Sequence, residues 1–153
     1  MKKLFMMVAV LGLLASCDKK QEKTDATAQD SVAVAIPAVV YYGTTKAVEG
    51  DKNEIEISVM IAEGDTVGTY EIIKTYTYGQ TGQQVKTKQD GTVVASKGTK
   101  DDKNATLLTM KKDGSDDKVT YYQVDEAGES IIELAPNKAK SADWKDFVFK
   151  KKK

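Results

Sequence analysis

The stretch Glu54-Ile55-Glu56-Ile57-Ser58-Val59 decides the fold class of this chain, because its polar and apolar residues alternate with a period of two. Successive side chains of a β-strand point to opposite faces, so the alternation places the two isoleucines and the valine on one buried face. An amphipathic helix would need apolar residues three or four positions apart. The stretch therefore predicts a half-buried strand that continues through Ile61.

Similar patterns recur from residue 39 onward. Aromatic and β-branched residues alternate with polar ones between Thr69 and Tyr78, where Lys74 interrupts the apolar row and is expected near a barrel mouth. The remaining expected strands are 39–44, 84–88, 92–96, 106–111, 118–124, 130–134 and 147–151. Turn sequences rich in Gly and Asp separate them, among them Gln89-Asp90-Gly91. About nine short strands joined by hairpins predict an all-β fold, a small antiparallel meander closed into a β-barrel. One helical turn, capped by Ser141, is expected over residues 140–146.

The N-terminus has the pattern of a bacterial lipoprotein signal. Lys2 and Lys3 precede an apolar run from Leu4 to Leu14, which at 11 residues is too short to span a bilayer as a helix. Leu14-Ala15-Ser16-Cys17 then resembles a lipobox, in which cleavage follows Ser16 and the Cys17 sulfur carries the lipid. The sequence thus predicts a signal peptide over residues 1–16 and a membrane anchor at Cys17.

Composition separates a tether from a folded domain. Residues 18–31 are charged and polar, with alanine as their only apolar residue type, and cannot bury enough surface to offset the entropy of ordering them. Apolar residues become dense from Val32 onward. The expected organisation is a signal peptide (1–16), a lipidated cysteine with a flexible tether (17–31) and a barrel domain (32–153).

The residue types that are missing exclude several kinds of chemistry. Cys17 is the only cysteine and the chain has no histidine, so thiol–imidazole pairs, serine triads and zinc or copper sites of the His/Cys type cannot form. All 23 basic residues are lysine, which removes the bidentate arginine fork. Cleavage would leave 21 lysines against 23 acidic residues, a balance that gives no reason to expect nucleic-acid binding.

The order of motifs resembles the N-terminal domain of the NlpE copper-resistance and envelope-stress lipoproteins. The motifs that carry the resemblance are Tyr42-Gly43-Thr44-Thr45, Gly64-Asp65-Thr66, Thr69-Tyr70, Asp113-Gly114, Tyr121-Tyr122-Gln123-Val124, Ile132-Glu133-Leu134 and Phe147-Val148-Phe149-Lys150. The resemblance covers residues 39–151 and implies a lipocalin-like barrel on a lipid anchor. Where that family has a CxxC pair, this chain has Ala47 and Gly50. Copper binding and redox sensing are therefore not expected, and we predict no metal or other cofactor.

Two sets of side chains are candidates for a binding site. The acidic loops, which contain Asp101, Asp102, Asp113, Asp116 and Asp117, could attract calcium but lack the twelve-residue calcium-loop spacing, so solvated turns are the favoured interpretation. Inward-facing tyrosines can line a pocket for an apolar ligand or simply fill the core. The pocket candidates are Tyr70, Tyr76, Tyr78 and Tyr121, with Tyr122 and Trp144 also considered.

These observations predict a non-enzymatic, lipid-anchored lipoprotein of the bacterial envelope, expected at the outer membrane, with a role in sensing or interaction that includes envelope-stress signalling. Its partners would be the membrane and an envelope protein. The alternative is a lipocalin-type carrier of a small apolar ligand inside the barrel. A hydrolase that uses Glu71 or Glu133 is the least favoured hypothesis, because no paired-carboxylate spacing is readable. The lysines at 150–153 are expected to form a solvated end that protects a terminal edge strand, rather than a lipid-binding site.

Replacing the cysteine tests the anchor directly. The Cys17→Ala variant should carry no lipid and should be either unprocessed or released from the membrane, because no other thiol exists in the chain. Membrane fractionation and mass spectrometry of the N-terminus give the readout. A variant that is still cleaved after Ser16 and still partitions with lipid would contradict the predicted anchor.

Overall fold

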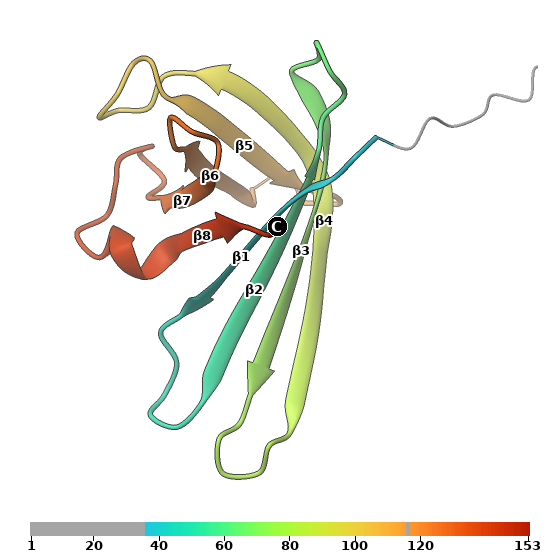
Figure 1. Ribbon diagram of the computed structural model, residues 1–153, viewed down its shortest axis with the longest axis vertical. Helices are drawn as coiled ribbons and strands as arrows, with labels where there is room; N and C mark the ends of the chain where they lie inside the picture. The colour runs from blue at the N-terminus through green and yellow to red at the C-terminus, as the bar shows by residue number, and fades with distance from the viewer. Residues whose placement is uncertain (1–35, 116) are drawn as a thin grey trace, which may run out of the picture. The chain divides into compact units, whose positions relative to one another are not determined.

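The computed structural model describes residues 36–115 and 117–153, which form an eight-stranded antiparallel barrel (Figure 1). Cys17, the predicted tether and Asp116 lie outside the described residues. The strands are β1 (Val39–Thr45), β2 (Lys52–Met60), β3 (Val67–Thr77), β4 (Gln84–Lys97), β5 (Thr106–Lys112), β6 (Val119–Val124), β7 (Ser130–Leu134) and β8 (Val148–Lys151).

Each strand pairs with the next one along the chain, and β8 returns to pair with β1. This meander confirms the predicted fold class. The closing seam pairs Tyr41 with Lys151 and Tyr42 with Lys150. Because β8 also pairs with β7, the lysine-rich end belongs to a strand with a neighbour on both sides. The prediction that these lysines protect an edge strand was therefore wrong.

The structure has eight strands rather than about nine, because the segments 84–88 and 92–96 form the single strand β4. The expected turn Gln89-Asp90-Gly91 lies in the middle of that strand and pairs with β3 throughout. The backbone of β5 comes close to Gly91, because a Cβ at this position would lie 2.1 Å from the carbonyl oxygen of Lys111. The glycine therefore marks a close backbone contact within a strand, not a turn.

The two sides of the barrel differ in length. β3 pairs with β4 from Thr77 and Gln84 onward, whereas β5 pairs with β4 only from Gly91 onward. The ends of the β1–β2 and β3–β4 hairpins thus project beyond the short strands, as Figure 1 shows. We call this projecting part, residues 44–54 and 74–88, the extension.

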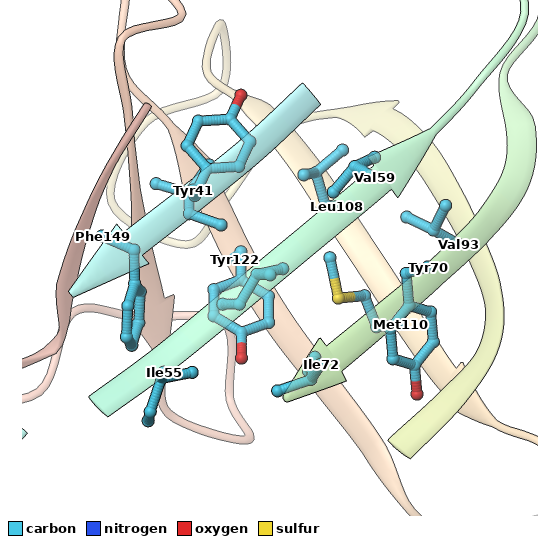
Figure 2. Close-up of a cluster of buried hydrophobic side chains, with 12 residues drawn as sticks. Tyr41, Ile55, Val59, Tyr70, Ile72, Val93, Leu108, Met110, Tyr122 and Phe149 are labelled. Atoms are coloured by element: carbon cyan, nitrogen blue, oxygen red, sulfur yellow. The ribbon is translucent and has the colours of Figure 1, made fainter. Parts of the chain in front are cut away.

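Alternation along the strands supplies the core. Ile57, Val93, Met110, Ile131 and Phe149 are fully buried in the barrel interior. Figure 2 shows side chains of β1 to β6 and of β8 in this interior. The rings of Tyr122 and Phe149 meet edge to face, with their centroids 6.1 Å apart. Ile55, Ile57 and Val59 all point inward, as the alternation in β2 predicts.

A second buried layer lies on the outer face of β5 to β7. Leu107, Ile132 and Leu134 point away from the interior yet are buried. The two long connections on this side, 98–105 and 135–147, join each other through Lys100 N–H donating to the Lys138 carbonyl (3.0 Å) and Lys140 N–H donating to Asp101 Oδ2 (2.8 Å). Parts of β5 and β7 are therefore apolar on both faces.

The expected helical turn is a short 3₁₀ helix, η1 (Trp144–Phe147), just before β8. Its N-cap position is Asp143, and no side chain caps it by a hydrogen bond. Ser141 contributes its backbone carbonyl, which accepts from the Trp144 N–H at 3.2 Å. The prediction of a Ser141 side-chain cap was wrong, because the 3₁₀ turn is satisfied by backbone groups.

The two faces of β2 should respond differently to substitution. Ile57→Ala removes a fully buried side chain, so the free energy of unfolding should fall by about 2–5 kcal/mol, with a melting temperature roughly 10 °C lower. Glu56→Gln, on the outer face, should cost at most about 1 kcal/mol through the loss of an exposed ion pair with Lys152. Thermal unfolding of both variants checks the register, and equal melting temperatures would contradict it.

Candidate functional site

The barrel interior is occupied by its own side chains. Tyr70, with 1% of its surface exposed, and Phe149, with none, are the largest fully buried residues. The hollows that the structure describes are lined by residues outside this core cluster, on the rim and on the extension. Space for a second molecule is therefore found on the surface of the barrel.

The four tyrosines predicted to line a pocket lie in different environments. Tyr70 is in the core, where its hydroxyl accepts a hydrogen bond from Gln89 Nε2 at 2.9 Å. Tyr121 is on the outer face of β6, with the Lys138 ammonium 5.2 Å from its ring centroid. Tyr76 and Tyr78 are both on the extension, and their rings meet edge to face at 5.0 Å. The structure thus brings Tyr76 and Tyr78 together, whereas Tyr70 lies in the core and Tyr121 on the outer face of β6.

Asp51 ties the two hairpins of the extension together. Its carboxylate accepts hydrogen bonds from the Tyr76 hydroxyl and from the Gly79 N–H, the latter at 2.8 Å. These two donors lower the pKa of Asp51. The backbones also touch here, because a Cβ on Gly79 would lie 1.8 Å from the Gly50 carbonyl oxygen. The tie fixes the position of both loops at the end of the extension.

A hollow of about 410 Å³ with a mixed apolar and polar lining lies at this end, and we call it the tip hollow. Val48, Tyr78 and Val85 line it while remaining 72%, 43% and 42% exposed. The rest of its lining is Glu49, Asp51, Gln80, Thr81 and Gln83. Clustered exposed apolar side chains rimmed by polar ones are typical of a contact surface for another molecule. Of the residues that line it, the sequence analysis named only Tyr78, and expected it inside the barrel, because no local pattern shows how far the opposite strands reach.

Glu133 of β7 and Tyr122 of β6 lie directly opposite each other in the sheet, and Glu133 feels the charge of Lys74. Burial raises the pKa of the Glu133 carboxyl, while the Lys74 charge and a hydrogen bond from the Tyr122 hydroxyl oppose that shift. Burial and the nearby Glu133 raise the pKa of Tyr122 well above its ordinary value. The charged neighbour of Glu133 is a lysine rather than a second carboxylate.

The other carboxylate considered for hydrolysis, Glu71, does not lie with Glu133. It is on β3, facing outward, and forms an ion pair with Lys88 at 2.5 Å. Hydrolysis by a carboxylate pair requires both groups on either side of one bond. The arrangement of Glu71 and Glu133 does not provide that geometry.

The acidic loops contribute to local hydrogen bonding. Asp101 accepts from the Lys140 N–H, and Asp102 Oδ1 accepts from the Asn104 N–H at 2.8 Å. Among residues 36–115 and 117–153, no three Asp, Glu, His or Cys side chains gather in a way that could hold a metal ion. No helix in this described part is long and apolar enough to cross a membrane.

Comparisons with protein families, with curated proteins and with solved structures found no match to this chain.

The pH dependence of stability tests the environment of Glu133. Because the pKa of this carboxyl is raised in the folded protein, the folded state holds the proton to higher pH than the unfolded chain does. Stability from this group is therefore greatest at low pH and falls as pH rises above its ordinary value of 4.5 toward the folded-state pKa. Glu133→Gln, whose amide oxygen can still accept from Tyr122, should gain stability relative to wild type across that rise.

Urea unfolding between pH 4 and pH 7 gives the measurement, with Glu126→Gln on the exposed β6–β7 turn as the matched control. A Glu133→Gln advantage that stays constant over this range would show that the raised pKa contributes nothing to stability.

Proposed function

We propose that this chain is a non-enzymatic, lipid-anchored protein of the bacterial envelope, expected at the outer membrane, whose barrel holds an interaction surface away from the lipid. The observation that carries the proposal is the contrast between a filled interior and a tip hollow on the surface that exposes Val48, Tyr78 and Val85. The lipid anchor rests on the sequence around Cys17. The resemblance to NlpE-like lipoproteins supports a role in sensing or signalling envelope stress.

The direction of the strands places the tip hollow and the start of the barrel at opposite ends. β1 begins at Val39 and runs toward the tip hollow, so the chain that leads from Cys17 joins the barrel at the opposite end. The 11 residues of β3 separate the two ends by about 35 Å, at roughly 3.3 Å per residue. The C-terminal segment returns to the anchored end, where Lys152 N–H donates to the Val40 carbonyl at 2.7 Å. The tip is therefore the end of the barrel opposite to the one where β1 begins.

The filled core favours an interaction module over the carrier alternative. A carrier for a small apolar ligand needs an enclosed pocket of a few hundred Å³. Here the interior positions that would line such a pocket hold Tyr70, Ile57, Met110 and Phe149, which belong to one buried hydrophobic cluster.

Site-specific photo-crosslinking in cells tests the proposal. A photoreactive residue at Val48, in the tip hollow, should give a discrete crosslinked product that depends on an intact Cys17. The matched control is Val67, which is 55% exposed and lies at the anchored end of β3. Equal crosslinking from both positions, or none from Val48, would contradict a partner at the tip.

A further inference from the structure

The first half of β4, which belongs to the extension, is an open sheet edge. Residues Gln84–Asp90 pair with β3 on one side, whereas β5 pairs with β4 only from Gly91 onward. Within the described part of the chain, no strand covers this segment on its other side. Because the Asp90 carbonyl already accepts from the Asp113 N–H, the free edge is Gln84–Gln89, and six consecutive strand residues are enough to accept an added strand.

The backbone hydrogen bonds at the two ends of this segment show which N–H and C=O groups are free to bind another strand. The Gln83 carbonyl faces β3, since it accepts from Tyr78 N–H, and the Asp90 carbonyl faces the β5 side, where it accepts from Asp113 N–H. Backbone groups alternate between the two sides of an antiparallel strand. The outward-facing N–H and C=O groups therefore include those of Gln84, Lys86 and Lys88.

Side chains along this edge have two distinct characters. Lys86 and Lys88 point to the outer face, in rows with Glu54 and Glu56 of β2. Val85 points to the other face, in the row of Tyr76, and lines the tip hollow. Lys88 is paired with Glu71, whereas Lys86 forms no ion pair with any described residue. An added strand would thus meet cationic side chains on one face and the tip hollow at its end.

A second copy of this chain fits the edge poorly. If two copies paired antiparallel about Thr87, Lys86 of each would face Lys88 of the other. Registers centred on Lys86 or on Lys88 place identical lysines opposite each other. Like charges directly opposite destabilise a strand pair. The three registers centred on residues 86, 87 and 88 therefore disfavour self-association, whereas a strand with acidic side chains complements these lysines.

We propose that the free edge of β4 binds an extended segment of a partner protein in which acidic and apolar residues alternate. The partner would add one strand next to β4, with acidic residues beside Lys86 and Lys88 and an apolar residue beside Val85, at the margin of the tip hollow. The inference rests on the proposed function, since it names the kind of partner that the extension recognises. Backbone hydrogen bonds give the affinity in this mode of binding, and alternate side chains give the specificity.

The test uses the purified full chain in detergent and a fluorescent peptide of sequence Glu-Val-Glu-Thr-Glu-Val-Glu, capped at both ends. We expect saturable one-to-one binding by fluorescence anisotropy. The same peptide with Lys in place of Glu should not bind. Lys86→Glu should weaken binding about tenfold or more, because it replaces attraction by repulsion. Lys103→Glu, an equally exposed change in the loop at the anchored end, should leave binding unchanged.

A second variant separates strand addition from simple charge attraction. Lys86→Pro removes an outward N–H that β3 does not use, so the barrel should keep its melting temperature while binding is lost. Peptide binding that survives Lys86→Pro with the fold intact would overturn the proposal, as would the absence of saturable binding up to about 1 mM peptide. Dimerisation of the chain that Lys86→Pro abolishes would also overturn it, in favour of a second copy at the edge.

The two proposals can fail separately. If the peptide does not bind but Val48 still crosslinks to a partner, the edge inference fails and the interaction role stands. If Val48 gives no crosslink in cells, the interaction role fails whatever the peptide does in solution.

Discussion

The seam between β1 and β8 is the interaction on which the barrel depends, because it converts a sheet with two edges into a closed surface. It is short, with two paired positions and one further hydrogen bond from Lys152 to Val40. Gly43 makes the seam possible, since a Cβ at this position would lie 2.8 Å from both the Phe149 ring and the Val148 carbonyl oxygen. Closure also places the Phe149 ring in the interior against Tyr122. The core and the seam thus support each other.

Local alternation was enough to predict the strands and the barrel, but it could not predict how long each side would be. In β2 one face is apolar and the other polar, so the period fixes the inward residues. In β5 the adjacent residues Leu107 and Leu108 are both buried, one on the outer face of the strand and the other in the core. The same ambiguity in β6 explains why Tyr121 was grouped with inward-facing tyrosines although Tyr122 takes that place. Gly91 looked like a turn residue because the sequence carries no sign of the β5 backbone that approaches it.

The candidate site escaped prediction for a related reason. Tyr76 and Tyr70 share a face of β3, yet only Tyr70 lies opposite the short strands and is covered. Whether Tyr76, Tyr78 and Val85 end in a core or on a surface depends on strands that are distant in the sequence. The same difference in length leaves the edge of β4 without a neighbour. The extension is therefore a product of the whole topology rather than of its own sequence.

The seam also has a consequence for the order in which the barrel is built. Every other strand pair joins neighbours along the chain, so hairpins can assemble as soon as their residues are available. Tyr41 and Lys151, by contrast, are 110 residues apart (151 minus 41), and their pairing needs the last strand of the domain. Until that strand arrives, β1 has a free edge and the side chain of Phe149 is missing from the core. The pairing of β1 with β8 is therefore expected as the last step of barrel formation. A nascent chain that lacks β8 cannot complete its core.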